Sequence, residues 1–157
     1  MLKKLKPYVI SVLIALAVGG FASLLTMKNM DLYQRINTPP LSPPSILFPI
    51  VWTILYILMG VSAAMVGKSE STPSFAKEKA IANYAVSLAV NFSWSIIFFN
   101  FEAFAVSFIV LLALLYFVIM TIILYKKLSP TAAYLQIPYA LWVAFAGYLN
   151  FGIVLLN

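Results

Sequence analysis

The sequence predicts an all-α integral membrane protein, a single bundle of five transmembrane helices. Of its 157 residues, 64% are hydrophobic and only 9% are charged, whereas soluble domains carry about 45–50% apolar and about 25% charged residues. A chain this short exposes a large share of its surface, so the apolar excess must face lipid. Five apolar runs divide the chain, each close to the roughly 20 residues that cross the hydrocarbon core.

The apolar runs set the boundaries that we expect for the helices, which are residues 8–27, 46–66, 80–100, 104–125 and 131–156. A long loop of residues 28–45 joins the first two spans, and shorter polar segments join the others. Because the chain is short and its pattern uniform, we expect one domain over residues 1–157.

The first span has a second interpretation, because a secretory signal peptide also begins with lysines and ends in small residues. The lysines here are Lys3, Lys4 and Lys6. The apolar core of a signal peptide is about 7–15 residues long, whereas this run is longer and no soluble domain follows it. We therefore interpret residues 8–27 as a retained membrane helix.

Basic residues predict the orientation of the chain, because cytoplasmic loops are enriched in Lys and Arg. The side that bears the amino terminus, the second loop and the fourth loop carries Lys3, Lys4, Lys6, Lys68, Lys77, Lys79, Lys126 and Lys127. The other side carries only Lys28 and Arg35. We expect a protein of the cell membrane whose amino terminus is cytoplasmic and whose carboxyl terminus is outside. These loop charges also account for the net charge of +6, so we expect no nucleic-acid partner.

Missing residue types exclude several kinds of chemistry. The chain has no Cys and no His, which removes disulfides, thiolate nucleophiles, Ser–His catalysis and most transition-metal sites. None of the charged residues lies inside an expected span, although pumps, proton-coupled exporters and many ion channels depend on such residues. We expect no metal site and no cofactor, and the sequence leaves open whether the protein is an enzyme.

Aromatic and polar side chains recur every three or four residues in three of the spans, which places each set on one helix face. The sets are Trp52, Tyr56 and Gly60; Ser87, Asn91, Trp94, Ser95 and Phe98; and Trp142, Ala146 and Asn150. Two interpretations remain open. The tryptophans can belong to an interfacial belt while Asn and Ser join helices, or the three faces can line one apolar pocket with a few polar groups. The fourth span lacks such a set, so we expect it at the periphery.

The first loop is stiff, because Pro39, Pro40, Pro43 and Pro44 fix their backbone dihedrals. We consider it either a lid over one end of the bundle, presenting Tyr33, or an ordered connector.

Small residues spaced four apart allow helices to approach closely. The pairs Gly60 and Ala64, and Ala85 and Ala89, serve either a homodimer or the internal packing of the bundle. We favour the homodimer slightly.

Three motifs resemble the translocator protein family, also called TspO/MBR, the tryptophan-rich sensory proteins or the peripheral benzodiazepine receptors. They are PPSILFPIVWTILYILMG at residues 43–60, NFSWS at 91–95 with two further Phe at 98 and 99, and PYALWVAFAGYLN at 138–150. The resemblance implies a five-helix bundle, often dimeric, with a pocket beneath the first loop that binds porphyrins and isoquinoline-carboxamide or benzodiazepine drugs. Carried over by motif, the ligand-binding residues are Tyr33, Pro43, Phe48, Trp52, Asn91, Trp94, Trp142, Ala146 and Asn150.

The family is also linked to light-dependent breakdown of protoporphyrin IX, and the resemblance implies that Trp52 and Trp142 carry this photochemistry. The chain departs from the family pattern at Leu41 and Ile46, where many members have Trp. No basic residue follows Tyr148, so the cholesterol-recognition pattern of animal members is missing. We therefore expect a bacterial member with weak or absent sterol binding.

Three functions remain open at this stage. The leading hypothesis is a membrane protein that binds a tetrapyrrole and senses it or promotes its oxidative degradation in light. The alternatives are a passive transporter of porphyrins or other lipophilic molecules, since no intramembrane charge is available for coupling, and a regulatory membrane protein whose partner contacts depend on the ligand.

Overall fold

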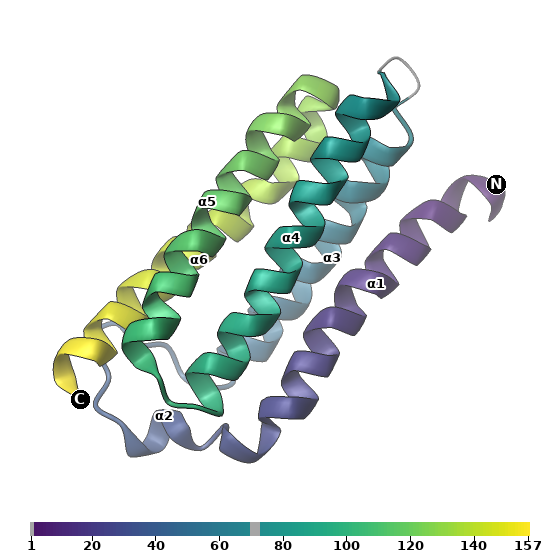
Figure 1. Cartoon of the computed structure of the whole chain (residues 1–157). Helices are drawn as coiled ribbons and strands as arrows, with labels where there is room; N and C mark the ends of the chain where they lie inside the picture. The colour runs from purple at the N-terminus through teal and green to yellow at the C-terminus, as the bar shows by residue number, and fades with distance from the viewer. Residues whose placement is uncertain (1, 70–72) are drawn as a thin grey trace.

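Five long helices run back and forth along one axis and place the two chain termini at opposite ends of the bundle (Figure 1). The computed structural model describes residues 2–69 and 73–157, and within them every regular element is helical. The long helices are α1 (Leu2–Thr26), α3 (Leu47–Gly67), α4 (Ser74–Phe99), α5 (Phe104–Leu128) and α6 (Pro130–Leu156). The all-α bundle of five apolar helices that the sequence predicts is confirmed.

The segment between α1 and α3 is only partly helical. It contains a 3₁₀ turn, η1 (Met27–Asn29), and one turn of α-helix, α2 (Leu32–Arg35). The remainder, up to the start of α3, is extended or turn-like and contains the prolines. The loop of residues 28–45, which is called the lid below, therefore crosses the end of the bundle as a segment with short helical turns and an extended, proline-rich part.

Local sequence explains where several helices begin and end. Ser129 caps α6 by accepting a hydrogen bond at its Oγ from the backbone N–H of Ala132 at 3.3 Å, and Pro130 occupies the first turn, where no N–H is needed. Helix α5 ends with Lys126 and Lys127, whose charges favour the negative end of the helix dipole.

Helix α4 begins at Ser74, six residues before the expected position 80. Its first turns contain Lys77, Glu78 and Lys79 and continue the helix beyond the apolar span. Ser74 Oγ donates a hydrogen bond to Glu78 Oε1 at 2.6 Å within this extension.

The helices pack in a fixed order around the core. Helix α5 packs on α4 and α6, α3 packs on α6, and α1 packs on α3 and α4. The contact between α1 and α3 is close at Gly60, where an added Cβ would lie 2.5 Å from Val12 Cα. Gly60 therefore serves packing within the bundle.

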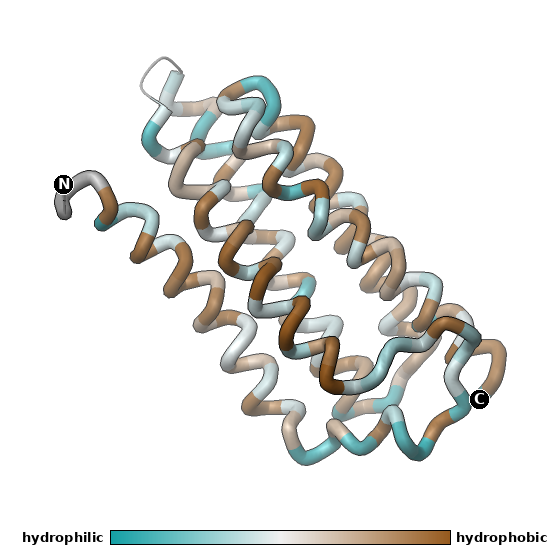
Figure 2. The backbone as a smooth tube through the Cα atoms, turned by 180° about the vertical axis from the view of Figure 1, so that it is seen from behind, coloured by the Kyte–Doolittle hydropathy of each residue, from teal (hydrophilic) through white to brown (hydrophobic). Residues whose placement is uncertain are grey.

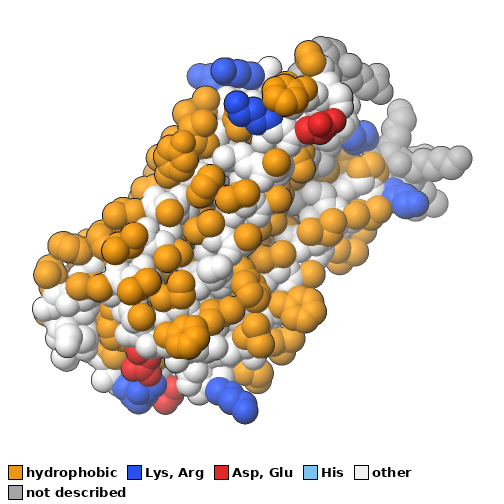
Figure 3. Space-filling view, in the orientation of Figure 1, with side chains coloured by type: hydrophobic (Ala, Val, Ile, Leu, Met, Phe, Trp, Pro, Cys, Tyr) orange, Lys and Arg blue, Asp and Glu red, His pale blue; other side chains and the backbone are white. Residues whose placement is uncertain are grey.

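The surface of the bundle is apolar along its length and polar at its ends. Charged side chains gather at the two ends on the face shown in Figure 3, and the backbone coloured by hydropathy shows the same division (Figure 2). Large apolar side chains that are more than half exposed occur on all five long helices, among them Leu13, Phe21, Ile54, Phe75, Ile109, Tyr116 and Leu141. Such a surface is stable in lipid and not in water, so the chain is a multi-pass membrane protein.

Candidate functional site

A small aromatic cavity lies beneath the lid, between α2 and the adjoining ends of α3, α4 and α6. Its volume is about 50 Å³, and its wall consists of Tyr33, Phe48, Trp52, Trp94, Phe98, Phe99, Ala146, Leu149 and Asn150. Neither α1 nor α5 contributes to this wall. The lid supplies Tyr33, and the three helices supply the rest.

The aromatic rings around the cavity contact one another. Tyr33 lies 5.0 Å from Phe48 between ring centroids, Trp52 lies 6.4 Å from Trp94, and Trp94 stacks on Phe98 at 5.5 Å. Aromatic pairs at these separations are mutually stabilising, by roughly 0.5–1.5 kcal/mol each beyond their burial. Tyr33 also lies 6.3 Å from Phe98, so the wall is a connected set of flat π surfaces.

Asn150 is the polar residue of the wall and joins three helices. Its Oδ1 accepts hydrogen bonds from Trp94 Nε1 at 3.2 Å and from Ser107 Oγ at 3.0 Å. Its Nδ2 donates to the carbonyl of Phe104 at 2.9 Å. Because an amide nitrogen has two hydrogens, one N–H of Asn150 remains for a further acceptor.

Asn91 lies deeper in the bundle than the cavity wall. It is 1% exposed, and its Nδ2 donates to the hydroxyl of Tyr56 at 3.0 Å. Within the described residues, Asn91 Oδ1 has no hydrogen-bond partner. Trp52, which lines the cavity, has its ring 5.7 Å from that of Tyr56.

A second cavity of about 100 Å³ adjoins the first along α1. Its wall includes Gly19, Ala22, Ser23 and Thr26 of α1, Met30, Pro49 and Tyr56, and Ser95. Phe48 and Trp52 belong to both walls. These two rings therefore form the partition between the cavity under the lid and the space beside α1.

The structure brings six of the nine predicted ligand-binding residues to one cavity and leaves three outside its wall. Tyr33, Phe48, Trp52, Trp94, Ala146 and Asn150 line it. Pro43 lies in the lid, and Asn91 lies in the core. Trp142 lines an open groove of about 500 Å³ between α3 and α6, together with Pro138 and Phe145. It touches the cavity wall only indirectly, with its ring 6.0 Å from that of Phe48. Whether these three residues bind a ligand stays a prediction.

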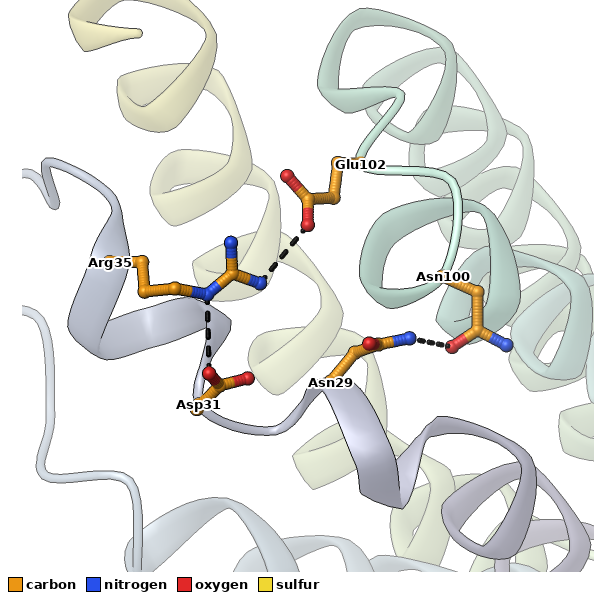
Figure 4. A network of polar contacts seen from close by, with 5 residues as sticks. All are labelled: Asn29, Asp31, Arg35, Asn100 and Glu102. Atoms are coloured by element: carbon orange, nitrogen blue, oxygen red, sulfur yellow. Dashed lines mark hydrogen bonds and ion pairs between the residues drawn. The ribbon is translucent and has the colours of Figure 1, made fainter.

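One side of the lid is held by polar contacts with the turn between α4 and α5 (Figure 4). Arg35 binds Glu102 at 3.1 Å and Asp31 at 3.3 Å, and Asn29 Nδ2 donates to Asn100 Oδ1 at 2.9 Å. The hydrogen bond with Glu102, helped by the charge of Asp31, raises the pKa of Arg35, so its guanidinium stays charged.

The other side of the lid is held by the end of α6. The backbone N–H of Asn37 donates to Asn157 Oδ1 at 2.9 Å, and Asn157 Nδ2 returns a bond to the carbonyl of Asn37 at 2.9 Å. Tyr148 Oη donates to the carbonyl of Pro40 at 2.8 Å. Pro39 packs on Gly152, where an added Cβ would lie 2.5 Å from the proline ring. The lid is therefore fixed at both flanks of the cavity.

The helical bundle, the cavity under a proline-rich lid and the tryptophans in its wall agree with a comparison of sequences. The profile of the TspO/MBR family matches residues 11–156. The chain belongs to the TspO/MBR family. The resemblance predicted from the three motifs is thus confirmed.

Relatives in this family come from distant organisms. The chain is 34% identical to the tryptophan-rich protein TspO of Chlorobaculum tepidum, over 92% of this chain and 91% of that protein. It is 37% identical to the protein CrtK of Rhodobacter capsulatus, over 80% and 78%. It is 32% identical to the translocator protein of Bos taurus, over 86% and 81%. The similarity thus covers most of each chain.

Three residues of the cavity wall in this TspO/MBR protein were not among the predicted ligand-binding residues. Phe98 belongs to the predicted face of the third span, so helical spacing could have identified it. Phe99 follows it directly, on a different face, and Leu149 is a leucine among many. Both lie within the three family motifs, but helical spacing does not mark either of them as a residue of the cavity wall. Within residues 2–69 and 73–157, no group of three or more His, Cys, Asp or Glu could hold a metal ion.

Proposed function

We propose that this protein binds a tetrapyrrole such as protoporphyrin IX under its lid and senses it or promotes its light-dependent oxidative degradation. The observation that carries the proposal is the connected aromatic wall of the cavity, with Asn150 as its polar member. A flat, conjugated macrocycle stacks favourably on such rings. Drugs of the isoquinoline-carboxamide and benzodiazepine classes are also flat and apolar, and we expect them at the same site.

Binding requires the site to open. Sites for small organic molecules usually measure about 300–1,000 Å³, and this cavity measures about 50 Å³. Displacement of Phe48 and Trp52 joins it to the space of about 100 Å³ beside α1, and outward movement of the lid adds more. The proposal therefore includes movement of the lid, which breaks exposed hydrogen bonds and an ion pair and separates the apolar contact of Pro39 with Gly152.

Tryptophan is the residue that this proposal assigns to photochemistry. The excited porphyrin, with oxygen as the terminal oxidant, would react next to Trp52, which faces both cavities. Trp142 lies one ring further out, behind Phe48. The two residues thus differ in distance from the ligand, and we expect Trp52 to have the larger effect on degradation.

The test adds protoporphyrin IX to the purified protein in detergent and follows Trp fluorescence and porphyrin absorbance, first in the dark and then in light. Saturable quenching followed by protein-dependent loss of porphyrin is expected. The Trp52→Phe variant should bind about two- to tenfold more weakly, the range that corresponds to an aromatic contact of roughly 0.5–1.5 kcal/mol, and should lose degradation. Tyr134→Phe, which changes an exposed ring outside the cavity wall, serves as the control. Absence of saturable quenching would contradict the proposal.

Passive transport is the second candidate, and the two adjoining cavities favour it. Together they lead from beneath the lid to the side of α1, which is the geometry of a path for a lipophilic molecule. Flux of porphyrin into sealed vesicles in the dark, abolished with the lid cross-linked, would support transport. A third alternative, a regulatory protein, predicts neither flux nor degradation but ligand-dependent co-purification with a partner.

We further propose that the protein resides in the cell membrane with a cytoplasmic amino terminus, on the basis of its lysine distribution, and that it forms a homodimer. Because the chain has no Cys, single cysteines report orientation directly. Gln34→Cys on the lid should react with a membrane-impermeant maleimide in intact cells, and Lys126→Cys should not. The reverse pattern would overturn the orientation, and a monomer mass in detergent and in lipid would overturn the dimer.

A further inference from the structure

A large apolar groove lies at the end of the bundle opposite the lid. It separates α1 from the adjacent α3 and α4 and has a volume of about 550 Å³, many times that of the aromatic cavity. Its walls are formed by Pro7, Ser11, Ile14, Ala63, Ala64, Gly67, Lys68, Ile81, Tyr84, Ala85 and Leu88. None of its lining residues belongs to the wall of the aromatic cavity, although both sites use α3 and α4.

Small residues keep this groove open. Ala63, Ala64 and Gly67 form the α3 wall and Ala85 part of the α4 wall, so no long side chain fills the space. An added Cβ at Gly67 would meet no other atom within 4 Å. Helix α1 diverges from the bundle towards its amino-terminal end (Figure 1). The space is therefore a property of the backbone arrangement and the choice of small side chains.

Positive charge lies at the mouth of the groove. Lys68 follows α3 and belongs to the groove wall, and its Nζ lies 5.0 Å from the centre of the Tyr8 ring on α1. This contact connects the two sides of the groove at the level where the apolar spans end. Lys6 precedes the lining residue Pro7 by one position and is exposed. An anionic group at the mouth would thus meet Lys68.

The dimensions suit a hydrocarbon chain with a charged head. The lining residues of α1 extend from Pro7 to Ile14, which is about 10 Å at roughly 1.5 Å of rise per residue. An apolar space of this length in a membrane protein is filled by lipid, and lysine at its end keeps its ammonium at the water interface while its stem covers apolar surface. A phosphate at that level forms a charge-assisted contact with it.

We propose that the groove between α1 and the α3–α4 pair is a binding site for an anionic phospholipid, with one acyl chain between the helices and the phosphate at Lys68. Charge complementarity selects the anionic lipid over a zwitterionic one, because each lysine near an anionic headgroup contributes about fivefold in affinity. The lipid replaces the missing helix–helix contact along this part of α1.

The test exchanges the purified protein into a mixture of phosphatidylglycerol and phosphatidylcholine with identical acyl chains and counts retained lipids by native mass spectrometry. Preferential retention of phosphatidylglycerol is expected. Lys68→Gln should reduce this preference about fivefold, whereas Lys126→Gln, a lysine at the same end outside the groove wall, should leave it unchanged.

A second pair of variants tests the location of the chain. Ala85 lines the groove and is exposed, so a larger side chain at this position does not disturb the core. Ala85→Leu should fill part of the groove and reduce retention of both lipids. Ala113→Leu makes the same change on the exposed face of α5, away from the groove, and should have no effect. Equal retention of the two lipids by the wild-type protein would overturn the headgroup selectivity. Unchanged retention in Ala85→Leu would overturn the site.

Discussion

The two ends of the bundle are closed in different ways. At the lid end, a loop crosses the helices and is fixed by side chains of α6 and of the α4–α5 turn, and the cavities there measure about 50 and 100 Å³. At the opposite end, α1 diverges and a groove of about 550 Å³ remains. Exposed polar contacts together with the packing of Leu32 and Pro39 thus close one end, and lipid has access to the other. We therefore expect the lid to move first. The position of α1 in the bundle depends on its close contacts with α3.

The largest effect on stability is expected where α1 touches α3, because this contact lies between the lid end and the groove end of the bundle. Gly60→Val places side-chain atoms on the Val12 backbone, from which even a Cβ would lie 2.5 Å away. We expect destabilisation of about 1–3 kcal/mol or more, as for overpacking generally, seen as a lower thermal unfolding midpoint in detergent. Gly67→Val, on the same helix with open space around it, is the control. If both variants unfold alike, the close approach does not support α1.

An intermediate effect on stability is expected from replacing two buried amide side chains, Asn150 near the lid end and Gln136 near the opposite end. Asn150→Leu removes three hydrogen bonds that join α4, α5 and α6 and leaves Trp94 Nε1 unpaired. Gln136→Leu removes one bond, from Gln136 Nε2 to Ser62 Oγ at 3.2 Å. We expect a loss of about 2 kcal/mol for Asn150→Leu and about 1 kcal/mol for Gln136→Leu. Reversible unfolding in mixed micelles measures both, and the opposite order would contradict the structural role of Asn150.

The smallest effect on stability is expected from the ion pair of the lid. The side chains of Arg35 and Glu102 are 49% and 43% exposed, and exposed pairs contribute about 0.2–1 kcal/mol. Arg35→Gln should therefore barely change the unfolding midpoint while increasing proteolysis within the lid. A double-mutant cycle with Glu102→Gln in low and high salt isolates the pair. A coupling that salt does not weaken would show that the lid is held by something else.

The number, order and approximate position of the helices follow from the sequence because the bilayer imposes a length on apolar segments. The start of α4 shows the limit of this argument. Hydropathy marks where a helix leaves the lipid, but hydrogen bonding continues the helix through Lys77, Glu78 and Lys79 to Ser74. Polarity and helix ends are separate properties, so the boundary of a span and the boundary of a helix differ.

The composition of the site follows from the sequence less completely. Spacing places Trp52, Tyr56 and Gly60 on one stripe, yet Trp52 faces the cavities while Gly60 contacts α1. Periodicity shows which residues share a face, but the rotation of each helix depends on all its neighbours. For this reason the groove position of Trp142 and the lid contacts of Asn157 had no signal in the sequence.

The four-residue turn between α4 and α5 has a consequence for how the protein enters the membrane. Helix α4 is the least apolar of the five spans and α5 the most apolar. Asn83 of α4 is satisfied by α5, since its Nδ2 donates to the carbonyl of Phe117 at 2.9 Å and to Thr121 Oγ1 at 2.8 Å. A span with an unpaired amide inserts poorly alone, whereas a strongly apolar helix that follows after four residues supplies both a hydrogen-bond partner for the amide and a driving force for insertion. During biosynthesis, α4 and α5 are therefore expected to leave the translocation machinery together, as one helical hairpin.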